Sequence, residues 1–252
     1  MIARFKERLR NPHMKKRALL VILLSLASLP TATLSRSEDA AAPKLPLSEL
    51  LQKFNERQQA VQSLTAAFTE RKDLSLLAKP VVSNGTFLYA KPARIKWEYS
   101  APEPRVFLIT EDRFLAYYPN QKRAEEVPLS KLAGRRVFRV FGIGQTSEDL
   151  QKFFDISQSD SGDEKDCYLL VLTPKRRRVK DRLQLVRFWV DSKTYLPRKL
   201  EYLESDGDST LLSFTNIRLN PEIAEGRFDV DIPKDVQISS TFSGFSGSSQ
   251  SR

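Results

Sequence analysis

The sequence predicts a mainly β fold with a few helices, in which an antiparallel meander of short strands forms one large core. From residue 66 onward, aromatic and β-branched residues recur in short segments with a period of two, and turn residues separate the segments at regular intervals. A single stretch before them has the spacing of an amphipathic helix. The 252 residues, 40% of them hydrophobic, are enough to fill such a core.

The amino end has the pattern of a secretory signal peptide. Basic residues 15–17 precede an apolar run from Ala18 to Leu29, and Pro30 and small residues follow. This run is shorter than the roughly 20 residues that a membrane-spanning helix needs. We therefore predict that residues 1–35 are a cleaved signal peptide and that the protein is exported to the periplasm.

Loss of this leader changes the charge of the chain. Residues 1–35 hold seven of the 41 basic and one of the 31 acidic residues, so the remainder carries a formal charge of +4. That charge suits acidic membrane surfaces or partners and is too weak to indicate nucleic acid. The true start is either Met1 or Met14, and residues 36–46 have the composition of a flexible tether.

A helix is predicted over residues 47–64, with Ser48 at a position suited to an N-cap. Its apolar stripe recurs at spacings of three, four and seven and consists of Leu47, Leu50, Leu51, Phe54, Val61 and Leu64. Five strands are then predicted, at residues 66–73, 82–90, 93–100, 105–110 and 113–118. The turn signals among them are Asn84–Gly85, Lys91–Pro92, Pro102, Pro104 and Pro119–Asn120.

The β pattern breaks between residues 129 and 154. An apolar cluster set among arginines is followed by Gly142 and Gly144, and Thr146 or Ser147 is suited to cap a second short helix that runs to Phe154. We expect this insertion to form a flap or plug. Strands resume at residues 167–173, 183–190, 197–204, 210–219 and 226–230, and residues 239–252 are predicted to be a disordered tail.

Alternation places apolar side chains on one face of successive strands. In residues 94–99 the other face carries charges, which predicts one dry face and one solvated face. Either this face is an ordinary core, or it and the helices enclose a cavity for an apolar ligand. The side chains concerned are Phe87, Tyr89, Ile95, Trp97, Tyr99, Phe107, Ile109, Tyr117, Phe188, Val190 and Tyr202.

The sequence carries no motif for a catalytic, phosphate-binding or metal site, so we predict neither an enzyme nor a cofactor. The only histidine is His13, in the predicted leader. Cys167, the only cysteine, opens an apolar strand, where a buried side chain is expected. The carboxylate pairs Glu125–Glu126 and Asp206 with Asp208 are interpreted as solvated surface.

One basic run leaves two interpretations open. Residues 175–180 carry five basic side chains between two predicted strands. They form either a solvated hairpin tip or a binding patch.

Several separated segments resemble the LolA family of periplasmic lipoprotein carriers, and the resemblance spans residues 47–238. Their order along the chain makes the resemblance specific. The segments are Ser63–Glu70, Gly85–Tyr89, Lys91–Tyr99 with Pro102, Tyr117–Pro119, Leu170–Pro174 and Gly226–Val236.

The resemblance implies an unclosed antiparallel β-barrel of about eleven strands, with a helical lid over an apolar cavity. Ile95 and Trp97 fall on positions that face the cavity in that family. Lys91 stands where the family has an arginine that latches the lid, and lysine cannot make the same forked bond. The implied lid and latch residues are Lys91, Val137, Phe138, Val140, Phe141 and Ile143.

The same resemblance implies a function without catalysis. Acylated lipoproteins or lipids are the expected cargo, an inner-membrane exporter the donor and an outer-membrane protein the acceptor, with the carrier itself a monomer that binds no nucleic acid. Two alternatives stay open. One is a carrier of another lipid or glycolipid, and the other is a lipid-sensing regulator similar to RseB.

Overall fold

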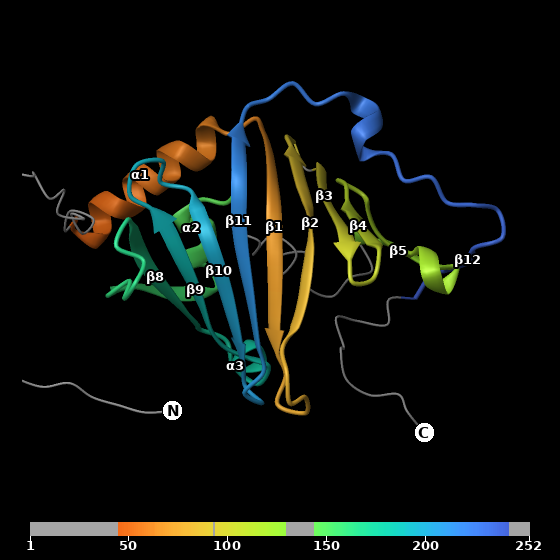
Figure 1. Ribbon diagram of the computed structural model, residues 1–252. Coiled ribbons are helices and arrows are strands. Elements are labelled where there is room, and N and C mark those ends of the chain that lie inside the picture. Colours follow the sequence, from red (N-terminus) through yellow and green to blue (C-terminus); the bar gives the residue numbers. More distant parts are fainter. Residues whose placement is uncertain (1–44, 93, 130–143, 242–252) are drawn as a thin grey trace, which may run out of the picture. The chain divides into compact units, whose positions relative to one another are not determined.

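The structure is a computed structural model. It describes residues 45–92, 94–129 and 144–241. All of them lie in the compact unit Asp39–Arg252. Most of these residues form one large sheet, and a few short helices accompany it (Figure 1). None of the helices in these ranges is long and apolar enough to cross a membrane.

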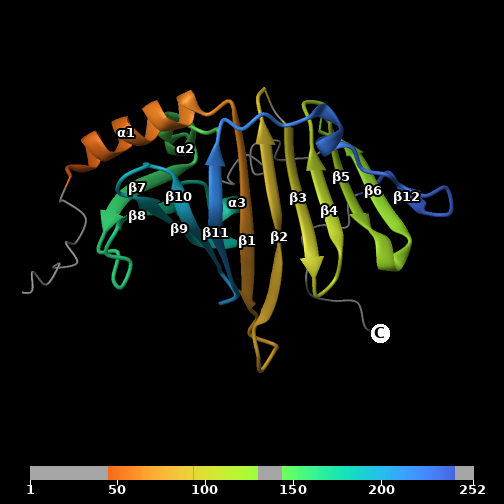
Figure 2. The same cartoon turned by 45° about the horizontal axis from the view of Figure 1, so that its top comes forward.

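The sheet has 12 strands in the order β12-β6-β5-β4-β3-β2-β1-β11-β10-β9-β8-β7. Neighbouring strands pair antiparallel, except for β12, which pairs parallel with β6. The order begins with β12 and ends with β7, so the mainly β fold is an unclosed barrel, with one strand more than predicted (Figure 2). The strands are β1 (Ser63–Asp73), β2 (Val81–Ala90), β3 (Arg94–Ala101), β4 (Arg105–Ile109), β5 (Arg113–Tyr118), β6 (Arg123–Pro128), β7 (Phe154–Ser159), β8 (Cys167–Pro174), β9 (Leu183–Asp191), β10 (Pro197–Glu204), β11 (Ser209–Leu219) and β12 (Gln237–Ser239).

Three strands lie outside the segments that the sequence predicts. β6 reads RAEEVP and does not alternate between apolar and polar residues, and β7 reads FDISQS, in which only Phe154 and Ile156 are apolar. β12 has three residues and pairs with a strand that lies more than a hundred positions earlier. Short or polar strands give a weak sequence signal, so pairing with another strand decides them: β6 and β7 pair with the adjacent β5 and β8, and only β12 has a distant partner.

Helix α1 (Leu47–Ala60) is shorter than predicted. It begins after Pro46, whose carbonyl accepts the Leu50 N–H, and the predicted Ser48 cap is wrong because the N-cap is Pro46 and Ser48 lies inside the helix. The chain turns to extended backbone at Val61. Leu64 belongs to β1, where its burial follows period-two alternation and not the helical stripe.

Two other short helices lie between strands. In α2 (Ser147–Gln151) the Thr146 side chain accepts the Asp149 N–H, which confirms the predicted cap. The helix ends before Phe154, which opens β7. Helix α3 (Arg177–Lys180) lies in the β8–β9 connection, so the basic run is part of a hairpin connection. Cys167 opens β8 and is buried, as expected.

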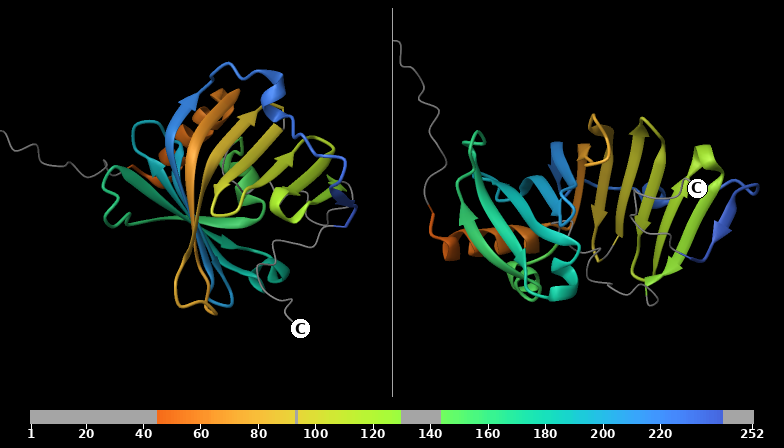
Figure 3. Two further views of the ribbon diagram at one scale, coloured as in Figure 1. Left: turned by 45° about the vertical axis from the view of Figure 1, so that its right-hand side comes forward. Right: turned by 90° about the horizontal axis from the view of Figure 1, so that it is seen from below.

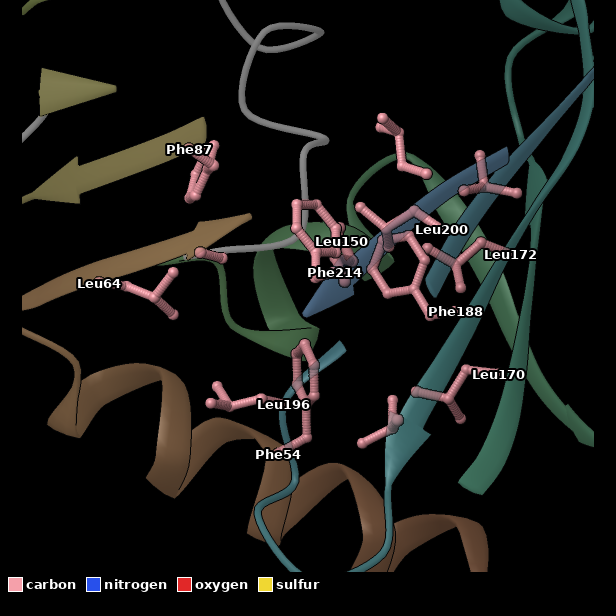
Figure 4. Packing of buried hydrophobic residues seen from close by; sticks show 14 of the residues in the cluster. Phe54, Leu64, Phe87, Leu150, Leu170, Leu172, Phe188, Leu196, Leu200 and Phe214 are labelled. Carbon is pink, nitrogen blue, oxygen red and sulfur yellow. The ribbon is translucent and has the colours of Figure 1, made fainter. Parts of the chain in front are cut away.

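The two faces of the sheet are covered differently. We call the face that carries Phe68, Phe87 and Trp97 the inner face, and the face that carries Leu88 and Leu108 the outer face. α1 and α2 pack on the inner face, where Phe54 and Leu150 lie among strand side chains (Figure 4). Both side chains are almost completely buried, so these helices complete the main core.

The outer face is covered by the segment after β11. Residues 226–230 are not a strand, because η4 (Glu225–Phe228) forms a 3-10 turn there. Phe228 and its neighbours Val230 and Ile232 pack across the outer face. Lys96 is only 6% exposed, and its Nζ donates to the carbonyl oxygens of Arg227 and Asp229. The predicted solvated face of β3 is therefore wrong.

Two further interpretations of short motifs are also corrected. Asn84–Gly85 lies inside β2 and is not a turn. Glu125 is 2% exposed in β6 and pairs with Arg123 at 2.7 Å between Oε1 and Nη1, so it is not solvated surface. Asp206 and Asp208 do lie in the turn between β10 and β11, as predicted.

Candidate functional site

A band of aromatic side chains runs across the inner face from β11 to β5. Strand alternation directs each of these side chains to this face. The register between neighbouring strands places the rings beside one another. The view from below in Figure 3 shows these strands side by side. The rings in contact are Phe214, Phe87, Trp97, Phe68, Tyr99, Phe107, Phe114 and Tyr118.

The contacts in this band are close and mostly edge-to-face. The Phe87 and Trp97 ring centroids are 4.6 Å apart, and those of Phe68 and Tyr99 are 4.8 Å apart. Tyr99 then meets Phe107 at 5.7 Å. These geometries are the favourable ones for aromatic pairs, so the band is a continuous apolar surface.

Gly85 explains how the rings of β1 and β3 meet across β2. A Cβ at this position would lie 2.7 Å from Cζ of Phe68 and 2.2 Å from the Glu98 carbonyl oxygen. The Phe68 ring therefore lies over the backbone of β2 at Gly85, where any side chain would collide with it. The glycine that resembles a turn signal is required here for close approach.

Ten of the eleven predicted apolar site residues lie on the inner face. Phe87, Tyr89, Trp97, Tyr99, Phe188 and Val190 belong to the main buried cluster, Ile109 belongs to a smaller cluster beside it, and Ile95, Phe107 and Tyr202 pack against these clusters while remaining half-buried.

Tyr117 is the exception. It lies on the outer face, in the cluster that Phe228 covers. Ile109 pairs with Phe114 and Phe107 pairs with Ala116, so Tyr118 and not Tyr117 continues the inner face. The adjacent tyrosines made the face ambiguous in sequence, and only the register between β4 and β5 decides it.

A second small group links α1 to the sheet and to α2. Lys91, the predicted latch, donates from Nζ to the Gln59 carbonyl oxygen at 2.7 Å, close to the end of α1. Asn55 accepts the Ser147 N–H at 2.6 Å and donates to the Glu148 carboxylate. Lys91 thus bonds a helix carbonyl as a single donor, not as a fork.

The predicted lid lies mostly outside the described residues. This holds for Val137, Phe138, Val140, Phe141 and Ile143, and for Gly142. Gly144 is described, with φ of +76°. Its N–H donates to Gln58 Oε1 at 2.8 Å, and a Cβ there would lie 2.5 Å from the Tyr89 hydroxyl. Glycine is therefore required at this position for both space and backbone conformation.

The inner face ends in a charged cluster that the sequence analysis did not find. Glu70 continues the alternation of Leu64, Ala66 and Phe68 and is 6% exposed. Its carboxylate accepts from the Tyr99 hydroxyl at 2.8 Å and from Arg105 Nη2 at 3.1 Å. Lys72 Nζ lies 3.7 Å from the same carboxylate. Alternation alone could have placed Glu70 on the inner face.

The surroundings of this carboxylate keep two hydroxyls protonated. Burial, with the negative charge of Glu70, raises the pKa of Tyr99 well above its ordinary value. The same two causes raise the pKa of Tyr202. The Arg105 guanidinium stacks over the Tyr99 ring, 3.8 Å from its centroid. The cluster is therefore a polar end to an otherwise apolar face.

Side chains of the main buried cluster meet beneath α1. A cavity of about 10 Å³ lies there, lined by Leu64, Ala66, Leu196, Pro197, Phe214 and Ile217. This volume is at the lower limit for a single water molecule. The half-buried Ile95 and Phe107 lie further along, on β3 and β4, where the main and smaller clusters join.

Comparison with known protein families agrees with this geometry. The family model described as outer membrane lipoprotein carrier protein LolA matches residues 59–231. An outer-membrane lipoprotein carrier protein of Cupriavidus necator is 28% identical over 181 residues, which cover 71% of this chain and 82% of that protein. One of Pseudomonas fluorescens is 25% identical over 224 residues, which cover 87% of this chain and 98% of the relative.

Solved structures of similar fold include a LolA superfamily protein from Nitrosomonas europaea and MucB. The first has 15% identity and a TM-score of 0.39 and covers 74% of this chain and 99% of that one. MucB has 16% identity and a TM-score of 0.45 and covers 76% of this chain and 64% of that one. The family model matches more than half of the chain, and the sheet is mainly antiparallel and unclosed. The chain belongs to the LolA family of outer membrane lipoprotein carrier proteins.

Proposed function

We propose that this protein is a periplasmic carrier that holds the acyl chains of lipoproteins against the inner face of its sheet and moves them from the inner to the outer membrane. The observation that carries the proposal is the continuous apolar band of the inner face in a member of the lipoprotein carrier family. The half-buried Ile95 and Phe107 are the side chains that an acyl chain reaches first.

Transport through water explains why such a face is needed. Each buried methylene contributes about 0.8 kcal/mol, so a chain of roughly 15 methylenes gains about 12 kcal/mol on leaving water. An acylated lipoprotein therefore cannot cross the aqueous periplasm unprotected. The signal-peptide pattern before residue 36 supports export to this compartment.

Release requires a competitor for the same surface. In the empty protein, the protein's own side chains, including Phe54 and Leu196, are buried on the inner face beneath α1. Cargo binding displaces some of these contacts, and their return favours release to an acceptor with a better apolar site. An inner-membrane exporter is the donor in this scheme, an outer-membrane acceptor receives the cargo, and the carrier acts as a monomer.

A release assay tests this function. Inner-membrane vesicles that hold acylated lipoproteins are incubated with the protein, and the lipoprotein in the soluble fraction is measured. Ile95→Glu places a charge on the inner face, and burying an unpaired charge is costly, so soluble lipoprotein should fall by about tenfold or more.

Ile238→Glu is the matched control, because Ile238 is 61% exposed on β12 and the charge change is the same. This variant should release as much lipoprotein as the unmodified protein. Full release by Ile95→Glu would contradict the proposal. If free lipids or glycolipids replace lipoproteins in the soluble fraction, the proposed cargo is wrong and the carrier belongs to a different cargo class.

A further inference from the structure

Three connections meet at one end of the sheet. The Ser75 N–H, in the β1–β2 connection, donates to Asp208 Oδ1 at 2.6 Å. Ser205, in the β10–β11 turn, donates from its N–H to the Arg182 carbonyl oxygen and from Oγ to that of Asp181, just after α3. Figures 1 and 3 show the three connections at the same end. We call residues 74–82, 175–182 and 205–208 the loop end.

The loop end exposes apolar side chains that nothing covers in the structure. Leu76 is 83% exposed and Leu77 is 51% exposed, both at the tip of the β1–β2 connection. Val81 and Val82 follow at 37% and 46%. Of the five large hydrophobic side chains found exposed in the described residues, these are four. A gathering of this kind indicates an interaction surface, whereas single exposed side chains do not.

The connections of the loop end also carry basic side chains. Residues 74–82, 175–182 and 205–208 together contain seven Lys or Arg and three Asp, a formal charge of +4. Arg177, Arg178 and Lys180 are exposed, and within the described ranges they form no ion pair. In the β10–β11 turn, Asp208 accepts the Ser75 N–H and Asp206 accepts the Asp208 N–H, and both aspartates count against the basic charge because these donors are uncharged. The loop end therefore carries a net positive charge beside exposed leucines.

We propose that the loop end docks on a bilayer surface that contains anionic lipid. Leucine side chains at the tip enter the boundary between headgroups and acyl chains, and the basic side chains of α3 meet the anionic headgroups. The positive charge of the loop end is opposite in sign to the anionic lipid, and its exposed leucines can enter the bilayer boundary. Both features favour binding to such a surface. This docking goes beyond the carrier function, because it requires no cargo and uses none of the inner-face residues.

Vesicle sedimentation tests the proposal, using the protein isolated from its own cells. Binding to vesicles that contain phosphatidylglycerol is compared with binding to vesicles of phosphatidylcholine alone. We expect binding to the anionic vesicles and a strong decrease at high salt. The triple variant Arg177→Gln, Arg178→Gln, Lys180→Gln should bind on the order of 100-fold less, since each basic residue near an anionic surface contributes about a fivefold factor.

A control with the same charge change isolates the position of the charges. Lys165→Gln, Lys193→Gln and Lys234→Gln remove three exposed lysines that lie outside the loop end and form no ion pair in the described part of the chain. This control should bind within a few fold of the unmodified protein. Equal losses in the two triple variants would overturn the proposal, because net charge and not the loop end would then explain binding.

The apolar contribution is tested separately. Leu76→Ser with Leu77→Ser should lower anionic-vesicle binding by about tenfold or more, whereas Ile238→Ser, at the other exposed hydrophobic position, should leave it unchanged. Because all three side chains are exposed, the melting temperature should be the same in every variant. Binding that persists without the leucines, or equal absence of binding to both kinds of vesicle, contradicts membrane docking and leaves a protein partner as the occupant.

Discussion

Glu70 and Arg105 form the least expected pair of residues on the inner face, because a buried charge on an apolar surface loses its hydration. Their side chains are 8% and 19% exposed, and Tyr99 bonds the same carboxylate. Removal of Glu70 leaves Arg105 without its counter-charge, and removal of Arg105 leaves Glu70, among the described residues, with only the more distant Lys72, at 3.7 Å. Replacement of both by apolar residues removes the desolvation cost together with the attraction.

We predict strong coupling between these two residues in unfolding free energy. Glu70→Leu and Arg105→Leu should each destabilise the protein by about 3 kcal/mol, and the double variant by clearly less than the sum. Urea unfolding of the four proteins measures the coupling. Asp235→Leu serves as a control, because Lys122 and Asp235 are 71% and 59% exposed and their pair should contribute about 0–1 kcal/mol. A Glu70→Leu cost no larger than this control would show the cluster to be unimportant for stability.

The sequence predicted side chains on the inner face best where strands alternate plainly. Ile95, Trp97 and Tyr99 in β3 follow one another at every second position. The prediction placed Tyr117 on the wrong face. Its neighbour Tyr118 is also a tyrosine, so residue type did not distinguish the two faces. Glu70 was missed because its charge argued against burial, and only the structure shows Tyr99 and Arg105 converging on it.

At the scale of elements, contacts between segments decided what periodicity could not. Helix α1 and most of the strands have clear periods and were predicted with small errors in their ends. β6 has no such period and β7 has only two apolar residues, and each pairs with the strand next to it in sequence. Residues 226–230 have the alternation of a strand but lie across the outer face, where Lys96 bonds their carbonyls.

Asn220 fastens three elements together. Its Oδ1 accepts the N–H groups of Gln62 and Ser63 at the start of β1, and its Nδ2 donates to the Ala60 carbonyl at the end of α1. The residue itself follows β11 with φ of +50°, a conformation that asparagine tolerates better than most residues. The side chain therefore caps α1 and fixes the entry of β1.

Two substitutions separate the bonds of Asn220 from its backbone conformation. Asn220→Gly keeps the positive φ and loses the side-chain bonds, so we expect a cost of about 1–3 kcal/mol. Asn220→Ala also adds strain at positive φ and should cost about 1 kcal/mol more. Thermal unfolding with circular dichroism measures both values. If Asn220→Gly is as stable as the unmodified protein, the side chain does not hold α1 and β1 together.

At the scale of the whole molecule, the two faces of the described sheet and one of its ends carry different kinds of side chains. The inner face carries the aromatic band, the outer face is covered by the segment after β11, and the loop end carries exposed leucines and free basic residues. The proposed cargo site and the proposed membrane contact therefore use different side chains. Substitutions at one should leave the other intact, which makes each separately testable.

Photo-cross-linking from the two faces tests the central claim most directly. A photoreactive phenylalanine analogue replaces Phe107 on the inner face or, as the matched control, Tyr117 on the outer face of the neighbouring strand. The protein is irradiated in its own cells, and adducts are identified by mass spectrometry. We predict acylated lipoproteins cross-linked through position 107 and none through position 117. Lipoprotein adducts at position 117 without adducts at position 107 would contradict acyl-chain binding on the inner face.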